Sequence, residues 1–182
     1  MLMSKIGKIS IDIPDKVKLA LNGNILQVEG PLGKSQLNLD IEMFELNINN
    51  EKKNVSIKPK VINQTSKRLW GMNRSLVNNA IVGASAGYTK ILELTGVGYR
   101  ASIKGKQLNL QLGFSHDINF DIPETIKVTV EKQTTIKILG IDKQEVGMIA
   151  SKIKSIRPPE PYKGKGIKEK GQYILRKEGK KK

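Results

Sequence analysis

Residues 13–19 of the chain read Ile-Pro-Asp-Lys-Val-Lys-Leu, and residues 122–128, which begin 109 positions later, read Ile-Pro-Glu-Thr-Ile-Lys-Val. Each run continues into a polar turn and an alternating segment that ends at a glycine, Gly30 in the first case and Gly140 in the second. Alternation of apolar and polar side chains is the period of a half-buried β-strand. The two runs therefore predict a duplicated unit, an antiparallel sheet covered by one helix.

Short alternating segments surround both runs. In the first half we expect strands at 9–13, 17–21, 25–28, 37–39, 44–48 and 55–57. In the second half we expect them at 89–94, 99–103, 108–112, 118–122, 126–130 and 135–139. Asn22-Gly23 and Lys104-Gly105-Lys106 are typical of tight hairpins, which favours antiparallel pairing.

The apolar spacing becomes helical twice. Residues 63–82 carry an apolar stripe with Trp70 beside it, and we expect Trp70 to pack in the core. The stripe consists of Leu69, Met72, Leu76, Val77, Ala80 and Ile81. A second helix is predicted to begin at Asp142, with Glu145 as capping-box partner, and to stop before Pro158.

The expected fold is α+β: two duplicated units, each an antiparallel sheet packed against one helix, plus a basic extended C-terminal tail. We place the first unit at 1–82, with an unpaired basic N-terminal arm, the second at 83–156 and the tail at 157–182.

The charge of the chain points to a polyanionic partner. Lys and Arg total 32 against 17 acidic residues, a formal net charge of +15, and residues 157–182 alone hold ten basic and three acidic side chains. So large an excess destabilises a compact state through self-repulsion unless a polyanion neutralises it. Nucleic acid is the partner that this pattern favours.

Catalytic, cofactor and membrane functions lack support in the sequence. Cysteine is absent and His116 is the single histidine, so thiol chemistry and multi-histidine metal sites are excluded. Residues 30–35 resemble a phosphate-binding loop but have Val28 where that loop needs glycine. Gly96 and Gly98 lack the third glycine of a dinucleotide fingerprint, so a bend between strands is expected there. We expect no enzyme activity, cofactor, metal, membrane span or small-molecule substrate.

Residues 157–167 read Arg-Pro-Pro-Glu-Pro-Tyr-Lys-Gly-Lys-Gly-Ile and form what we call the basic strip. Three prolines exclude a helix and a central strand, the glycines permit close backbone approach, and the lysines supply charged donors. The strip suits a phosphate backbone; the alternative is a solvated basic tail. Aromatic residues make up only 4% of the chain, which favours folded RNA over stacked single strands. The basic side chains expected to contact RNA are Lys152, Lys154, Arg157, Lys163, Lys165, Lys168 and Lys170, with further cations at Arg176, Lys177 and 180–182.

Residues 159–167 are similar to the signature of the large-subunit ribosomal protein six family, in its bacterial and organellar form. Residues 4–8, 94–101, 112–116 and 140–144 also resemble that family's landmarks, so the resemblance covers nearly the whole chain. It implies two duplicated α+β units that bind large-subunit ribosomal RNA near the sarcin–ricin loop and the translation-factor site, beside the proteins of the stalk base. Carried over by motif, the RNA contacts are Tyr162, Lys163, Gly164, Lys165 and Gly166, together with Lys168.

The chain departs from the family pattern in two places, at Met1-Leu2, which precede the family's usual start, and at Glu169. The family commonly has an aromatic residue where this chain has Glu169. Because phosphates repel a carboxylate, we expect Glu169 to turn outward. We also expect residues 168–182 to be disordered without RNA.

The sequence thus predicts a structural ribosomal protein. The alternative is a free RNA-binding factor that acts in assembly or regulation. An RNA-modifying enzyme would need a clustered acid and base or a cofactor loop, which the sequence does not show. The expected location is the ribosome of the bacterial cytoplasm or of an organelle, because no signal or transit peptide precedes the first strand.

Overall fold

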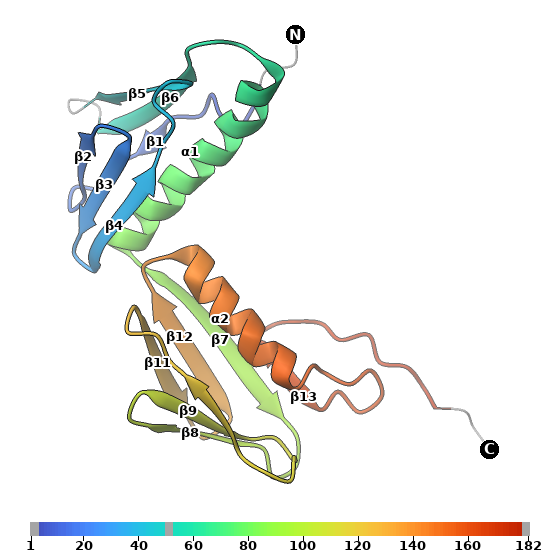
Figure 1. Cartoon of the computed structure of the whole chain (residues 1–182). Helices are drawn as coiled ribbons and strands as arrows, with labels where there is room; N and C mark the ends of the chain where they lie inside the picture. Colours follow the sequence, from blue (N-terminus) through green and yellow to red (C-terminus); the bar gives the residue numbers. More distant parts are fainter. Residues whose placement is uncertain (1–3, 50–52, 180–182) are drawn as a thin grey trace. The chain divides into compact units, whose positions relative to one another are not determined.

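The computed structural model describes residues 4–49 and 53–179 and divides the chain into two compact units (Figure 1). Unit 1 comprises Met1–Gly87 with Ile141–Lys143, and unit 2 comprises Tyr88–Gly140 with Gln144–Lys182. Each unit is an α+β structure with antiparallel sheets and one helix, as the sequence predicts.

Unit 1 contains two three-stranded antiparallel sheets, in the orders β1-β6-β5 and β2-β3-β4. Their strands are β1 (Ile11–Asp12), β2 (Lys18–Asn22), β3 (Ile25–Gly30), β4 (Gly33–Asn38), β5 (Phe44–Asn49) and β6 (Asn54–Pro59). Asn22 pairs with Ile25, so the hairpin loop is Gly23-Asn24, one position later than expected. Gly23 has φ +55°, which a residue with a side chain adopts at a cost. The turn-like residues 30–35 lie in the β3–β4 hairpin, as expected.

The helix of unit 1, α1 (Gln64–Ser85), packs against the β-strands through a buried face that includes Trp70, Val77 and Ile81. Trp70 is 7% exposed, and its Nε1 donates a hydrogen bond to the carbonyl of Ile57 at 2.6 Å. The predicted apolar stripe is wrong at Met72, which is 49% exposed, because the helix turns the Trp70 face inward instead. The N-terminal arm is not free either. A Cβ at Gly7 would lie 2.6 Å from the Trp70 ring, so the arm lies directly against α1.

Unit 2 contains a three-stranded sheet in the order β10-β9-β8 and a four-stranded sheet in the order β11-β12-β7-β13. The strands are β7 (Tyr88–Thr95), β8 (Arg100–Lys104), β9 (Gln107–Gln111), β10 (Ile118–Asp121), β11 (Ile126–Glu131), β12 (Thr135–Gly140) and β13 (Gly166–Glu169), and the helix is α2 (Lys143–Ile156). Lys104 pairs with Gln107, so the predicted tight hairpin at Gly105 is confirmed. The α2 stripe of Val146, Ile149, Ala150 and Ile153 is buried, as the spacing predicts.

The C-terminal tail contributes a strand to unit 2. β13 pairs antiparallel with β7 at the edge of the sheet, and Ile167 is fully buried in the core. The expectation of disorder from residue 168 onward is therefore wrong for Lys168 and Glu169, which belong to β13. The three prolines before β13 lie outside helix and strand, as their chemistry requires.

Candidate nucleic-acid interface

The basic strip forms a closed loop between α2 and β13. At its base the N–H of Ile167 donates to the carbonyl of Arg157 at 2.9 Å. Within the loop the N–H of Glu160 donates to Lys165 at 2.8 Å, and the N–H of Gly164 donates to Glu160 at 3.0 Å. The strip is thus a shaped loop fixed at both ends, and not a solvated tail that leaves the sheet.

The two glycines of the strip are buried against the chain itself. Gly166 has φ +140°, and a Cβ there would lie 2.6 Å from the carbonyl oxygen of Pro158. Gly164 has φ +71°, and a Cβ there would lie 3.3 Å from a guanidinium nitrogen of Arg176. Close backbone approach, which the sequence led us to expect toward RNA, is used here to fold the loop.

The remaining predicted contacts of the strip face solvent. Lys163 and Lys165 are exposed, and Tyr162 is 54% exposed. Arg157 lies over the ring of Phe114, with 5.0 Å between its Cζ atom and the ring centroid. Such stacking orients a guanidinium and leaves its N–H donors available.

Five of the predicted cations have no counter-ion among the described residues. Within residues 4–49 and 53–179, no carboxylate forms an ion pair with Lys152, Arg157, Lys163, Lys165 or Lys170, and all five are exposed. These five side chains therefore retain their full charge for a polyanion. Lys163 and Lys165 lie on the strip, Arg157 lies at its base, and Lys152 and Lys170 lie beside it.

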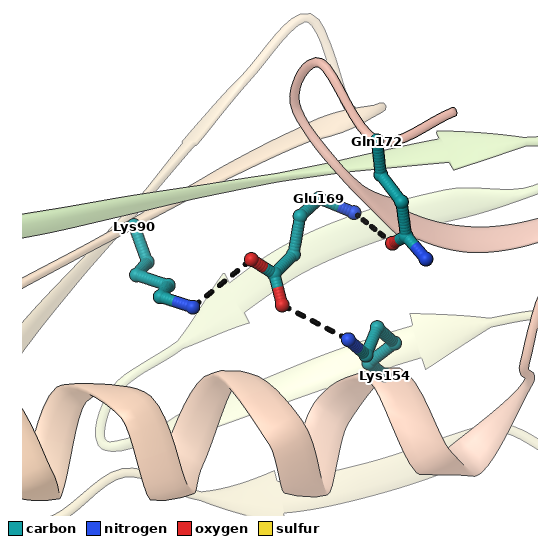
Figure 2. A network of polar contacts seen from close by, with 4 residues as sticks. All are labelled: Lys90, Lys154, Glu169 and Gln172. Carbon is teal, nitrogen blue, oxygen red and sulfur yellow. Dashed lines mark hydrogen bonds and ion pairs between the residues drawn. The ribbon is translucent and has the colours of Figure 1, made fainter.

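Two other predicted cations are paired inside the protein. Lys168 lies 3.4 Å from Glu93, and Lys154 lies 2.9 Å from Glu169. Glu169 also lies 2.9 Å from Lys90, so it sits between two lysines and does not turn outward as expected (Figure 2). Hydrogen bonds from Lys154 and Lys90 lower the pKa of Glu169. Glu169 turns inward because a partly buried carboxylate gains more from two ammonium groups than from solvent.

The structure gives several residues of this region roles that the sequence did not specify. Lys90 and Glu93 anchor β13, and Arg176 covers Gly164. Phe114 belongs to a family landmark, but its stacking under Arg157 depends on a contact between distant parts of the chain. These roles arise from pairing in three dimensions, which local patterns do not encode.

A second cationic surface lies on β8. Arg100, Ser102 and Lys104 share one face of the strand, beside a depression of about 200 Å³ that Asn109, Gln111 and Asp117 also line. Asp117 accepts a hydrogen bond from Gln111 at 3.2 Å. The nearby carboxylate makes this surface less suited to phosphate than the strip.

The described residues contain neither a metal site nor a membrane-spanning helix. In the part of the chain that the structure describes, no three His, Asp or Glu side chains are placed to hold a metal ion. None of its helices is long and apolar enough to cross a bilayer.

Known proteins resemble this chain over its full length. The large ribosomal subunit protein uL6 of Sphingopyxis alaskensis is 48% identical over 181 residues, which cover 99% of this chain and 100% of that protein. The proteins of the same name from Parvibaculum lavamentivorans and Caulobacter vibrioides are 47% and 49% identical over 180 residues, with the same coverage. The family model described as ribosomal protein L6 matches residues 95–170. The chain belongs to the ribosomal protein L6 family.

The part of this L6-family chain that the family model matches begins at the end of β7 and runs through the basic strip to the residue after β13. It therefore includes the exposed lysines of the strip, the Phe114 platform under Arg157 and the strand that anchors the loop.

Proposed function

We propose that the chain is a structural constituent of the bacterial large ribosomal subunit, and that its basic strip binds large-subunit ribosomal RNA near the sarcin–ricin loop and the translation-factor site. The full-length relatives are bacterial proteins of the large subunit by name. The L6 family is a structural component of the ribosome and not an enzyme family. The protein would act beside the other proteins of the stalk base.

The observation that carries the RNA-binding part is the presentation of Lys163 and Lys165. Both are exposed and form no ion pair with the described residues, and the two ends of their loop are joined by the hydrogen bond from Ile167 to Arg157. Point charges on a fixed backbone suit the recognition of RNA by shape and phosphate position, since less order must be gained on binding. Phosphate contacts of this kind supply affinity and orientation and carry no base sequence information.

Binding to an RNA fragment that contains the sarcin–ricin loop, measured across a salt series, tests the proposal. The variant is the double substitution Lys163→Gln and Lys165→Gln. Its matched control is Lys58→Gln with Lys60→Gln, which removes two exposed lysines at the same spacing from unit 1. If both strip lysines contact phosphates, the log–log salt slope should flatten by roughly 0.7 to 0.9 for each.

The control should leave the slope unchanged. Equal effects of the two double variants, or equal binding of an unrelated folded RNA, would contradict the proposed interface. In that case Arg100 and Lys104 on β8 are the next surface to test. Truncation before the strip is a poorer experiment, because it would also remove the buried Ile167 from unit 2.

Sedimentation separates a ribosomal constituent from a free RNA-binding factor. A structural constituent should co-sediment with large subunits in a one-to-one ratio and remain bound at moderate salt. A protein that washes off at that salt would be a free factor, whatever its affinity for the RNA fragment.

A further inference from the structure

One carboxylate connects three elements of unit 2. Glu169 lies at the end of β13, Lys90 lies on β7 and Lys154 lies on α2. Oε2 of Glu169 is 2.9 Å from Nζ of Lys90, and Oε1 is 2.9 Å from Nζ of Lys154 (Figure 2). We call these three residues the Glu169 network. It joins the tail strand both to the sheet and to the helix that packs on it.

The backbone around Glu169 holds the carboxylate in place. Its N–H donates to Oε1 of Gln172 at 3.2 Å, and the N–H of Gln172 donates back to its carbonyl at 3.0 Å. The N–H of Lys170 donates to the carbonyl of Ile91 at 2.9 Å, which continues the pairing with β7 beyond the strand. A tight turn thus ends β13 directly after Glu169.

The charges of β13 favour a single pairing with β7. Lys168 is opposite Glu93 and forms an ion pair with it, whereas Glu169 is opposite Leu92 and extends to the two lysines. Successive side chains of a strand point to opposite faces, so a shift of one residue exchanges the faces. A one-residue shift of β13 along β7 would place Lys168 near Lys90 and Lys154 and Glu169 near Glu93. It would also remove Ile167 from the core.

We propose that Glu169 is a positioning residue for RNA binding, which sets the pairing of β13 with β7 so that the basic strip presents Lys163 and Lys165. The inference rests on the proposed function of the strip. The strip ends where β13 begins, and its base is closed by the bond from Ile167 to Arg157. Any displacement of β13 therefore displaces the strip.

This assignment changes the role of Lys154. The sequence led us to expect an RNA contact there, but its ammonium group is engaged by Glu169, and its side chain is only 30% exposed. Lys154 and Lys90 thus act through the position of β13, and the phosphate contacts come from the unpaired lysines of the strip.

The substitution Glu169→Gln gives opposite expectations for positioning and for simple electrostatics. It removes a negative charge beside an RNA-binding surface, so electrostatics alone predicts tighter binding. Positioning predicts that affinity for the sarcin–ricin fragment falls roughly threefold to tenfold, the range typical of losing charge-assisted hydrogen bonds. Affinity for an unrelated folded RNA should stay equal or rise.

Glu93→Gln is the matched control, because it makes the same charge change on the neighbouring strand and loses only the 3.4 Å pair with Lys168. It should weaken specific binding less than Glu169→Gln does. Amide hydrogen exchange on the free proteins supplies a readout without RNA: Ile167 and Lys170 should exchange faster in Glu169→Gln than in wild type.

A second variant keeps the net charge constant. Exchanging the two residues, with Lys168→Glu and Glu169→Lys together, places like charges on both faces of β13 and should reduce specific binding more than Glu169→Gln. Specific binding equal to or tighter than wild type in both variants would overturn the positioning role. Absence of specific binding by the wild-type protein would instead overturn the proposed function, which the wild-type arm reports by itself.

Discussion

Unit 1 and unit 2 pair their strands in the same way but take them from the chain in a different order. The sheets β1-β6-β5 and β2-β3-β4 of unit 1 correspond to β10-β9-β8 and β11-β12-β7 of unit 2. The repeated sequence runs match β1–β3 with β10–β12, so β4–β6 match β7–β9. The strands β4–β6 come last in unit 1, whereas their equivalents β7–β9 come first in unit 2. The two units are therefore circular permutations of one strand-pairing scheme.

The repeated runs form the same local structure in both units. The N–H of Val17 donates to Pro14 at 3.0 Å, and the N–H of Ile126 donates to Pro123 at 3.1 Å. The acid of each run forms an exposed ion pair with a lysine, Asp15 with Lys53 in unit 1 and Glu124 with Lys106 in unit 2. The sequence repeat therefore marks a true structural equivalence.

The units differ at one sheet edge. In the described part of unit 1, no strand pairs with the outer edge of β4, whereas the equivalent strand β7 of unit 2 pairs with β13. The basic strip is attached at this point of difference. The shared scheme supplies two cores, and an added edge strand gives only unit 2 a fixed cationic loop.

The largest expected effect comes from removing the buried side chain of the added strand. Ile167→Ala should destabilise unit 2 by about 2 to 4 kcal/mol, the usual cost of a cavity at a fully buried aliphatic position. Amide exchange of Ile136 and Ile138 on β12 reports unit 2, and the fluorescence of the single tryptophan, Trp70, reports unit 1 during urea unfolding.

Leu175→Ala is the control for that substitution, because Leu175 lies in the same tail and is 69% exposed. It should change stability by no more than about 0.5 kcal/mol. An equal shift of the Trp70 transition in Ile167→Ala would contradict a stabilising role of β13 confined to unit 2.

The next largest loss of stability is expected from substituting Gly30 and Gly140, the glycines that end the two repeated segments. Neither has positive φ; each allows a helix to approach. A Cβ at Gly30 would lie 2.3 Å from the carbonyl oxygen of Ala84 in α1, and a Cβ at Gly140 would lie 2.7 Å from Cγ2 of Val146 in α2. Side chains yield more readily than helix backbone, so Gly30→Ala should cost about 3 kcal/mol and Gly140→Ala about 1 kcal/mol.

Urea unfolding followed by Trp70 measures the first substitution, and amide exchange in β12 measures the second. Gly105→Ala is a useful reference, because its Cβ would meet no atom within 4 Å and only its φ of +62° is strained. Equal costs at Gly30 and Gly140 would show that both helices can move away by the same amount.

Local patterns were sufficient to predict two α+β units of antiparallel strands, but not the strand order or the division of each unit into two sheets. Alternation located the strands, and glycine placed the hairpins at Gly23 and Gly105 to within one residue. The inward face of α1 was less predictable, because Met72 is as apolar as the other residues of the predicted stripe and only packing shows that it is exposed. Such choices depend on how the whole helix sits on its sheet.

The added strand was not predictable from local patterns. Prolines and glycines up to Gly166 describe a loop, and the short segment after it has no period long enough to indicate a strand. Its partners lie on β7, far away in sequence, so neither the burial of Ile167 nor the ion pairs of Glu169 can be seen locally. Charge alone indicated the strip but not which lysines are engaged internally, such as Lys154.

Helix starts give a smaller difference between the units. At the third helical position α1 has Ser66 and α2 has Glu145. The hydroxyl of Ser66 is buried, accepts from the N–H of Asn63 at 2.8 Å and donates to its carbonyl at 2.9 Å. Glu145 accepts a hydrogen bond from Thr125 at an exposed site. Ser66→Ala should lower the free energy of unfolding by about 1 kcal/mol and Glu145→Ala by about half as much. Thermal unfolding measures both variants. A larger loss in Glu145→Ala would contradict the greater contribution of the buried Ser66 hydrogen bonds.

The smallest effect concerns pH and separates the ion pairs of the two units. The pKa of Glu169 is lowered by hydrogen bonds from Lys154 and Lys90, and the pKa of Asp15 is lowered by its hydrogen bond to Lys53. A carboxyl group whose pKa falls on folding stabilises the native state above its unfolded pKa, about 4.3 for glutamate, and loses that contribution as pH drops through the native value. Unit 2 should therefore lose stability on acidification from pH 6 to pH 3, whereas the exposed Asp15 pair should contribute little to unit 1.

The part of this acid-induced loss of stability that comes from Glu169 should disappear in Glu169→Gln. The stability of unit 2 should therefore fall less steeply with decreasing pH in that variant. Asp15→Asn should leave the acid dependence of unit 1 almost unchanged, because Asp15 is fully solvated and water screens its pair with Lys53. Amide exchange of Ile167 and Val55 between pH 6 and pH 3, corrected for intrinsic rates, measures the two units in one sample. A flatter curve in Asp15→Asn than in Glu169→Gln would mean that the exposed pair, and not the Glu169 network, is the acid-sensitive contact. In that case β13 would be held on β7 by the burial of Ile167 and the backbone hydrogen bonds alone.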